Sequence, residues 1–352
     1  MDDDEDRVYG SDDEMMEDME DVFGDDEDVE RPRNVPKPKR QSSSSSSSSS
    51  SRPALPSKPA GLALAASPPS APTSAPEASS QTITPRTRCV FDAIAKKKFD
   101  LVKFLMIDQP GIVEKVNERG KTALHLACEH ENLDLIRMLV EGGASVEATD
   151  HNGATPLHVA TRFGHLTVAK YLVDVEPLLV TALDNDGCSP IHWAAQLGHA
   201  SIMRLFLMKP LPAGTLDVPA KYNSTPIHLA ARSGAAVIVK LLVKHGANVD
   251  LITTQRYTAL HFACSKGHTD TVTVLLSANA DTNVFNDQHR SPLHLATLGS
   301  YIHIIRQLLD ALAFTDPTDE MRNTPLHYAI KSGRKDIVDL LLRHDADRKS
   351  VV

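Results

Sequence analysis

The residues Thr155-Pro156-Leu157-His158 form a four-residue motif that returns six more times along the chain. Each copy has Thr or Ser first, Pro or Ala second, Leu or Ile third and His fourth. The copies begin at Thr122, Thr155, Ser189, Thr225, Thr258, Ser291 and Thr324. Successive copies are 33, 34, 36, 33, 33 and 33 residues apart. Self-similarity at a fixed period of about 20–50 residues indicates a solenoid built from stacked repeats.

The residues around each motif predict a helix-turn-helix unit. Thr is a good N-cap, and Pro is tolerated at the first helical position, where its missing N–H would have no partner. In the copy at Thr155, the first apolar stripe stops at Gly164, and apolar residues recur at helical spacing over 166–173. Residues 150–153, just before the motif, have the composition of a tight turn. One such helix pair cannot bury its apolar face alone, so neighbouring pairs must stack.

A motif of this type every 33 residues resembles the ankyrin repeat, and the resemblance extends from about residue 86 to 350. It implies an all-α solenoid of about eight helix-turn-helix repeats joined by β-turn hairpin loops. The first repeat lacks the motif but keeps the second-helix pattern at 99–105, as expected of a terminal repeat. We expect the repeats at 86–119, 120–152, 153–186, 187–222, 223–255, 256–288, 289–321 and 322–350.

Two stretches depart from the regular pattern. The 36-residue interval holds its extra residues near 209–214, where two prolines and a glycine exclude a continuous helix. We expect a longer loop there, after the second helix of the fourth repeat. In the seventh repeat, Leu312 takes the place that Gly143, Gly246 and Asn279 hold after other second helices, which predicts an irregular connection.

The residues before the repeats differ from them in charge and composition. Residues 1–30 contain 17 Asp and Glu against one Arg, a net charge of −16. Residues 31–85 carry a net charge of +6 and are rich in Ser, Pro and Ala, whereas residues 86–352 carry only +1. These compositions predict a disordered acidic tail at 1–30 and a disordered linker at 31–85.

The acidic tail has three interpretations. It is a solubilising segment, or a ligand for a basic partner or for the concave face of the array, or a regulated switch. Ser11 lies next to Asp12, Asp13 and Glu14, so it is a candidate site for an acidophilic kinase. The basic cluster at 37–40 is a candidate nuclear import signal, so we expect a cytoplasmic and possible nuclear location.

Sixteen histidines invite a metal or catalytic interpretation, which their repetition disfavours. A catalytic histidine is needed once, whereas one per repeat indicates a structural role. The resemblance to ankyrin repeats implies that the motif His and Thr hydrogen-bond locally and across repeats. His125 with Cys128, and His261 with Cys264, each have the spacing of half a zinc site, but both cysteines occupy small-residue core positions. We therefore expect no metal, no cofactor and no enzymatic activity.

The remaining composition limits location and partners. The four cysteines fall in different repeats without a disulfide framework, which indicates reduced thiols in an intracellular chain. No apolar signal segment precedes the repeats and no run of about 18 apolar residues exists, so we expect neither secretion nor membrane insertion. The repeats are nearly neutral, so nucleic-acid binding is not expected. We expect a monomer in the absence of a partner.

Binding of another protein is the expected function, because solenoids present an extended concave surface. In the ankyrin family the contacts come from the loop tips and the exposed side of the first helices. At matching positions we select as partner contacts Arg162, Phe163, Trp193, Tyr222, Arg256, Tyr257, Lys266, Arg290 and Arg322. Tyr and Arg are enriched at interface hot spots, which favours a contact centred on repeats five to eight. The alternatives are ordinary solvated tips and, for Trp193, a packing role.

Three functional hypotheses follow. The leading one is a non-catalytic adaptor; the second is an inhibitor-type regulator similar to the inhibitors of NF-κB, although their Asp-Ser-Gly-x-x-Ser motif is absent; the third is an assembly chaperone. A chaperone should work without residues 1–85, and a switchable regulator should not. The end Ser350-Val351-Val352 also fits the pattern of a PDZ ligand, a hydroxyl residue two before a terminal aliphatic carboxylate.

Overall fold

The computed structural model describes residues 85–350, which lie in the second of two compact units, Thr82–Val352. The predictions for the acidic tail, the linker, Ser11, the basic cluster at 37–40 and Val352 lie outside the described residues, as does the side chain of Ser350.

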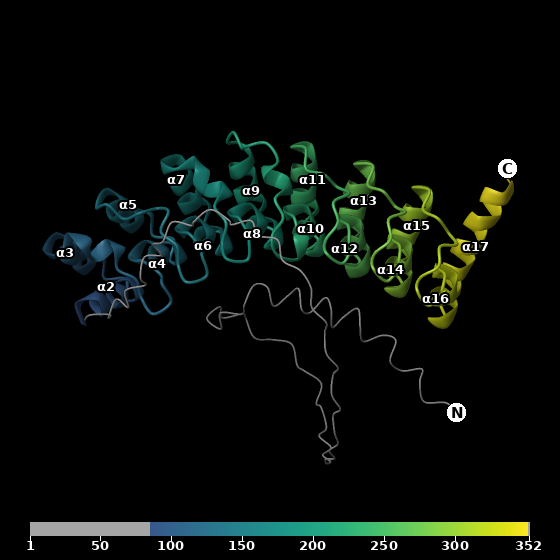
Figure 1. Cartoon of the computed structure of the whole chain (residues 1–352), viewed down its shortest axis with the longest axis horizontal. Helices are drawn as coiled ribbons and strands as arrows, with labels where there is room; N and C mark the ends of the chain where they lie inside the picture. The colour runs from purple at the N-terminus through teal and green to yellow at the C-terminus, as the bar shows by residue number, and fades with distance from the viewer. Residues whose placement is uncertain (1–84, 351–352) are drawn as a thin grey trace, which may run out of the picture. The chain divides into compact units, whose positions relative to one another are not determined.

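Within the described residues the chain forms sixteen α-helices arranged as eight consecutive pairs. The first helices of the pairs are α2 (Pro85–Ala95), α4 (Ala123–Glu129), α6 (Pro156–Arg162), α8 (Pro190–Gln196), α10 (Pro226–Arg232), α12 (Ala259–Lys266), α14 (Pro292–Leu298) and α16 (Pro325–Lys331). The second helices are α3 (Phe99–Asp108), α5 (Leu133–Glu141), α7 (Leu166–Val175), α9 (Ala200–Leu207), α11 (Ala236–Lys244), α13 (Thr269–Ser277), α15 (Ile302–Asp310) and α17 (Lys335–Ser350). Figure 1 shows the first helices in one row and the second helices in another, so the predicted all-α solenoid is confirmed.

Short 3-10 helices complete the connections. They are η2 (Pro110–Glu114), η3 (Pro177–Thr181), η4 (Thr215–Asp217) and η5 (Lys221–Asn223). Among the described residues the extended pairing is limited to a single antiparallel bridge between Val116 and Thr122. The hairpin loops between repeats are held by backbone bonds within each turn, such as Asp150 N–H to Ala154 O at 3.0 Å, and by side-chain and inter-repeat hydrogen bonds, without an extended sheet.

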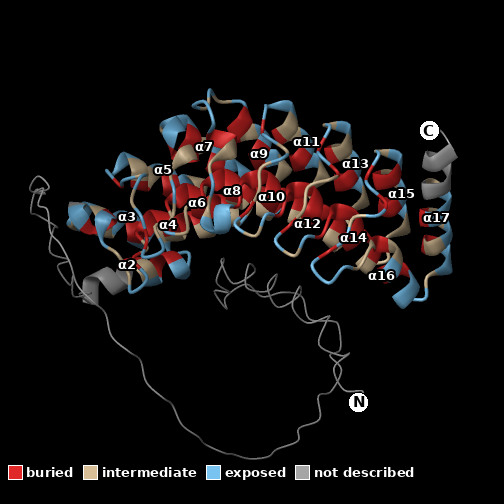
Figure 2. Ribbon diagram, turned by 45° about the vertical axis from the view of Figure 1, so that its right-hand side comes forward, coloured by how far each residue is buried: buried red, intermediate tan, exposed pale blue. Residues whose placement is uncertain are grey.

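The core lies between and within the two rows of helices (Figure 2). The seven first helices from α4 to α16 each have an alanine at the same position, and all seven of these side chains are buried: Ala127, Ala160, Ala194, Ala230, Ala263, Ala296 and Ala329. A methyl group at this position lets neighbouring first helices approach closely, as α8 does with α10. In the second row, α7 buries Val168, Ala169, Leu172 and Val173 on one helical face.

The two irregular stretches behave differently. The extra residues after α9 form a loop that turns at Gly214 (φ 80°) and continues into η4, so the predicted longer connection is confirmed. The predicted irregularity at Leu312 is wrong. Leu312 adopts a left-handed backbone (φ 63°) as Gly143 does, and Ala313 N–H then donates to Leu308 O at 3.0 Å, as in the regular connections.

Candidate protein-binding surface

Each four-residue motif caps the start of a first helix. In the third repeat, Thr155 N–H donates to Nδ1 of His158 at 3.1 Å, and Thr155 Oγ1 lies 2.9 Å from the same nitrogen. The reciprocal capping box is present in all seven copies of the motif. Because Nδ1 accepts an N–H, the ring proton of a neutral imidazole must be on Nε2.

The same histidines bind each repeat to the next. Nε2–H of His158 donates to Cys188 O at 3.0 Å, one repeat further along. The equivalent bonds join His125 to Ala154, His192 to Val218, His228 to Leu251, His261 to Arg290 and His294 to Asn323. Burial lowers the pKa to about 4 for His158, His192, His228, His261 and His294. The predicted hydrogen bonds within and across repeats are confirmed, and these histidines are neutral structural groups.

Histidines of the Gly-His turns bind in the opposite direction. Nε2 of His165 lies 3.0 Å from Glu129 O, and Nε2 of His268 lies 3.0 Å from Arg232 O, each in the preceding repeat. A carbonyl oxygen only accepts, so both Nε2 atoms donate. Repetition of a histidine therefore reflects its use at each repeat boundary.

An Asp or Asn five residues before the motif holds the hairpin tip in five of the seven copies. Asp150 Oδ1 accepts the N–H groups of Asn152 and Ala154, both at 2.9 Å. Successive tips are also joined through the backbone, as where Thr254 N–H donates to Tyr222 O at 3.0 Å. The tips form a continuous ladder, so their side chains occupy defined positions along one edge of the array.

The tip residue two places before the motif is left-handed in seven repeats, but its identity changes along the array. Repeats two to four have glycine there, whereas repeats five to eight have larger side chains. The four larger residues are Asn223, Arg256, His289 and Arg322, with φ between 58° and 61°. A left-handed backbone costs an ordinary L-residue about 1–2 kcal/mol. The later tips therefore hold side chains in a conformation that favours glycine.

Three of these four side chains contact the next tip. Asn223 Nδ2 donates to Ile252 O at 2.7 Å, Arg256 Nε donates to Phe285 O at 3.3 Å, and His289 Nδ1 lies 3.0 Å from Thr318 O. In the early tips the space is filled instead by the following loop. A Cβ added to Gly153 would lie 2.8 Å from Asn185 N, which explains why glycine is needed there.

The predicted partner contacts fall into three classes of exposure. Tyr222, Arg256, Arg322 and Phe163 are exposed, and Arg162, Trp193 and Lys266 are half-buried. The three exposed tip residues lie on the tips that precede the motifs of the fifth, sixth and eighth repeats. Phe163, Arg162, Trp193 and Lys266 lie on the first helices or directly after them. The structure thus arranges these seven along the row of first helices (Figure 1), which we call the inner helices, and along the later tips.

The other two predicted contacts, Tyr257 and Arg290, are buried, with exposed fractions of 7% and 4%. This corrects the expectation that they are exposed tip residues. The ring of Tyr257 packs against Phe262, with centroids 5.2 Å apart. Both follow a left-handed residue, which turns the chain inward and buries the next side chain beneath the tip.

Arg290 belongs to a buried polar cluster between the seventh and eighth repeats. Its Nε lies 3.7 Å from Asp319 Oδ2, and its guanidinium lies 5.8 Å from the centre of the Tyr328 ring. The hydroxyl of Tyr328 donates to the same Asp319 oxygen. Burial, and then the hydrogen bond to Asp319, raise the pKa of Tyr328. The cluster stabilises the boundary between repeats.

Trp193 combines packing with a polar contact. Its Nε1–H donates to Asp184 Oδ2 at 3.0 Å, and the guanidinium of Arg162 lies 5.4 Å from the ring centre. Burial is the main cause that raises the pKa of Asp184. The half-buried indole is therefore fixed from both sides while part of it remains accessible.

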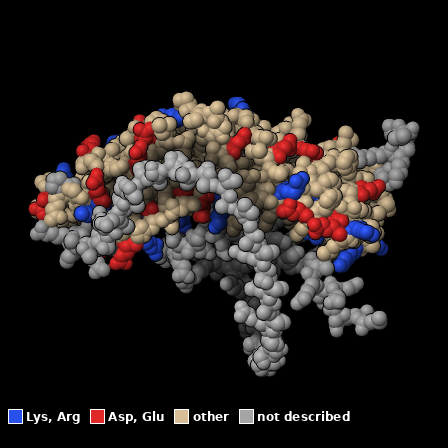
Figure 3. Space-filling view, viewed as in Figure 1, with Lys and Arg blue, Asp and Glu red and all other residues tan. Residues whose placement is uncertain are grey.

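The selection of contact residues from the sequence missed two features of the inner helices, an exposed isoleucine and a charge of one sign. Ile330 is 61% exposed beside Lys331, although the residue follows a buried alanine. The first helices from α6 to α16 also contain no Asp or Glu, whereas Figure 3 shows both charge signs intermixed along the second helices. Adding up charge over each helix row, rather than over the whole array, would have revealed this difference.

Three cysteines of the repeats are packed inside the array. Cys128, Cys188 and Cys264 are free and buried, and burial raises the pKa of each thiol. Both ring nitrogens of His125 are engaged by Thr122 and by Ala154 O, so it is not available to pair with Cys128 on a metal. In the part of the chain that the structure describes, no three His, Cys, Asp or Glu side chains gather as metal ligands.

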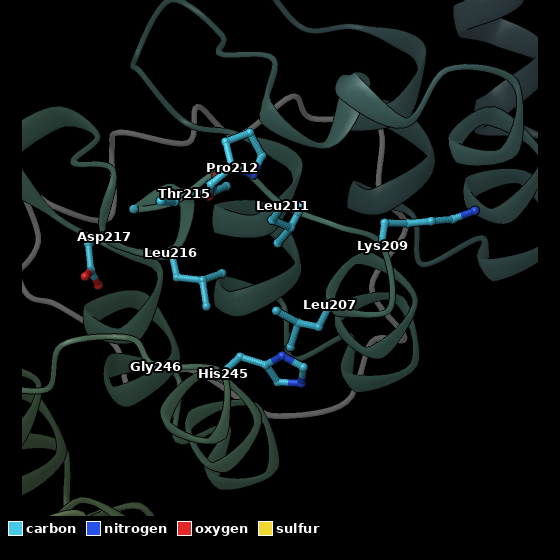
Figure 4. Close-up of a pocket in the computed structure, with 11 residues that line it drawn as sticks. Leu207, Lys209, Leu211, Pro212, Thr215, Leu216, Asp217, His245 and Gly246 are labelled. Atoms are coloured by element: carbon cyan, nitrogen blue, oxygen red, sulfur yellow. The ribbon is translucent and has the colours of Figure 1, made fainter.

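A pocket of about 280 Å³ lies beside the extra loop after α9. Figure 4 shows Leu216 and Leu211 between Asp217 on one side and Lys209 on the other. His245, just after α11, also lines it, so the pocket lies at the ends of second helices. It is separate from the hairpin tips and from the inner helices.

Comparison with known proteins agrees with this geometry. The family model described as ankyrin repeats (3 copies) matches residues 90–180, 150–218, 211–286 and 279–350. Ankyrin repeat domain-containing protein 63 of Mus musculus is 36% identical over 69 residues, and its Homo sapiens counterpart is 35% identical over 69. Each match covers 20% of this chain and 18% of the relative, so the chain aligns with less than a fifth of these proteins.

Within residues 85–350, the longest helices fall short of the length and apolar character needed to cross a membrane. The family match runs through the paired helices, the capped motifs and the hairpin tips described above. Ankyrin repeats are generally protein-protein interaction modules. The chain belongs to the ankyrin-repeat family.

Proposed function

We propose that this chain is a non-catalytic scaffold that binds another protein through its inner helices and the tips of repeats five to eight. One observation carries the proposal: among the hairpin tips, those of repeats five to eight hold larger side chains where a left-handed backbone favours glycine, and those of repeats two to four hold glycine. Residues held in sparsely populated backbone conformations cluster at functional sites. Exposed Tyr222, Arg256 and Arg322 lie on these tips, and Tyr and Arg are enriched at hot spots.

The chemistry of the described residues also supports a binding role. Six of the seven motif histidines, all except His327, have both ring nitrogens in structural hydrogen bonds, so they are not poised as acids or bases. Three buried thiols without a disulfide fit the reducing cytoplasm or nucleus that we propose as its location. Adaptor, inhibitor and assembly chaperone are versions of this function that differ in the identity of the partner.

The test compares proteins captured from lysate by the full chain and by a Tyr222→Ala, Arg256→Ala, Arg322→Ala variant. The matched control changes early tips instead, Arg119→Ala with Asn152→Ala, both exposed. The expected result is a partner retained by the wild type and the control and reduced at least tenfold in the triple variant. Circular dichroism checks that all three remain folded. Equal capture by the triple variant would exclude the later tips as the binding site.

A further inference from the structure

Six of the eight inner helices, α6 to α16, carry charge of one sign, whereas α2 and α4 contain Asp92 and Glu129. The six first helices from α6 to α16 contain four basic and no acidic residues. The four cations are Arg162, Arg232, Lys266 and Lys331, each at the last turn of its helix. The turns that follow, up to the second helices, contain no acidic residue either. We call these four residues the cation row.

Helix capping does not explain this asymmetry. Cations stabilise helix C-termini generally, so the same preference should appear in the second helices. The second helices from α5 to α15 instead contain five acidic and six basic residues. Two of them end on acids, Glu141 in α5 and Asp310 in α15. The cation row is therefore a property of the inner surface.

Apolar side chains alternate with the cation row. Phe163 and Leu197 are 40% and 42% exposed, and Ile330 also protrudes beside Lys331. Half-buried Trp193 lies against Arg162 at the same surface. The hairpin tips add charges of both signs, with Asp186, Asp287 and Glu320 among the acids. A ligand of the inner helices should thus be acidic and carry several apolar side chains.

The N-terminal residues of this chain have that composition. Within the acidic tail, residues 12–23 place apolar side chains among acids at intervals of three and four. They are Met15, Met16, Met19, Val22 and Phe23. Flexible methionines suit an irregular apolar surface. The 54 residues at 31–84 separate the tail from the array, and a coil-like chain of that length spans about 40 Å, or several repeats at about 8–10 Å each.

We propose that residues 12–23 bind the inner helices of the same molecule through neighbouring members of the cation row and the apolar side chains between them. The tail then competes with an acidic partner for this surface. The inference rests on the proposed function, because both use the inner side of the array. A tethered segment has an effective concentration in the millimolar range, so a contact with a dissociation constant well below a millimolar weakens the binding of an untethered competitor.

The first experiment titrates a fluorescein-labelled peptide of residues 8–30 onto the full chain. A neutral-tail variant changes every Asp and Glu between 12 and 21 to Asn or Gln. We expect this variant to bind the peptide at least tenfold more tightly than the wild type, because its own tail no longer competes. Equal affinity of the two chains would overturn the proposal.

The surface is assigned by two charge-matched variants made in the neutral-tail background. One removes the cation row by Arg162→Gln, Arg232→Gln, Lys266→Gln and Lys331→Gln. The other removes four exposed second-helix cations by Lys170→Gln, Lys240→Gln, Lys244→Gln and Arg306→Gln. Loss of at least tenfold in peptide affinity is expected only for the first variant. Equal loss in both would show binding to net charge, against the proposed site.

The fluorescence of Trp193 reports binding of the tail without any substitution in the repeats. This residue is the only tryptophan and lies at the proposed surface, so its emission reports on occupancy. Raising NaCl from 50 mM to 1 M shortens the Debye length to about 3 Å and should shift Trp193 emission in the wild type but not in the neutral-tail variant. Identical salt responses would contradict the proposal. A response that depends on protein concentration would assign the tail to a second copy and overturn the intramolecular contact.

The outcomes separate this inference from the proposed function. The peptide and emission measurements involve no outside partner. A tail that docks while the tip variants still capture their partner leaves the inference standing and rejects the tip site. Tip-dependent capture without any tail contact gives the reverse conclusion.

Discussion

The sixth and eighth repeats share a local sequence but differ in their neighbours. Both have Arg at the left-handed tip position, followed by a Thr-x-Leu-His motif that forms the same capping box. His261 is completely buried and also donates to Arg290 O in the next repeat. His327 is exposed and, among the described residues, has no following repeat to bind.

The difference separates what the motif contributes locally from what stacking adds. The capping box forms in both repeats, so it depends on sequence within one repeat. Burial and the Nε2 bond occur only where another repeat follows. The stability of a solenoid is approximately a sum of repeat terms and nearest-neighbour interface terms, and this pair of repeats isolates the second.

Acid should lower the free energy of unfolding more than any substitution below, because it acts on five buried motif histidines together. Their pKa values are about 4 in the fold and near 6.5 when unfolded, so the unfolded chain binds more protons between these values. Stability is therefore complete above pH 6.5 and is lost as the pH falls toward 4. The slope is about 1.4 kcal/mol per pH unit for each histidine, or about 7 kcal/mol for five.

Urea unfolding of the full chain at pH 8, 7, 6 and 5, followed by circular dichroism, measures this slope. The midpoint should change little between pH 8 and 7 and fall steeply from pH 6 to 5. An unchanged midpoint from pH 7 to 5 would mean that the histidines do not need to be neutral in the fold.

Removing the polar group at the base of the tip should affect the eighth repeat more than the sixth. Asp319 accepts N–H groups from Met321 and Asn323 and balances buried Arg290, so Asp319→Ala should cost about 3–5 kcal/mol. Thr253, at the same position in the sixth repeat, accepts one N–H from Tyr257, and Thr253→Ala should cost about 1 kcal/mol. Thermal unfolding compares the two, and similar losses would show that the Arg290 pair adds nothing.

Substituting the motif histidine should instead reduce stability more in the sixth repeat than in the eighth. His261→Asn removes one of the two donors to Arg290 O, the other being Asn286 N–H, and should reduce the free energy of unfolding by about 1–2 kcal/mol. His327→Asn disturbs only an exposed capping box and should cost about 0.5–1 kcal/mol. Urea unfolding at pH 7.5 measures both. If the two variants lose equal stability, the bond across the repeat boundary is not what the internal histidine contributes.

The period and the capping chemistry were readable in the sequence because they depend on residues close in the chain. Thr155 and His158 are three residues apart, and the resemblance of their motif to the ankyrin repeat implied their contact. Burial of Tyr257 and Arg290 was not predictable in this way. It depends on the left-handed residue before each one. Arg256 and His289 do not indicate a left-handed backbone from sequence, as glycine would. The regular, left-handed connection at Leu312 was not predicted for the same reason.

The smallest expected effect concerns the left-handed arginines themselves. Arg322→Gly keeps the left-handed backbone but lowers its cost of about 1–2 kcal/mol; the entropy that glycine loses on folding offsets part of this, so the free energy of unfolding should rise by about 0.5–1 kcal/mol. Arg256→Gly gains the same relief but loses the bond from Nε to Phe285 O, so its net gain should be smaller. Thermal unfolding of the full chain measures both shifts, with Gly153→Ala as the converse control that should lower stability. A gain in stability accompanied by weaker partner capture would mean that the strain is retained for binding, whereas a loss of stability in Arg322→Gly would show that the tip conformation is not strained.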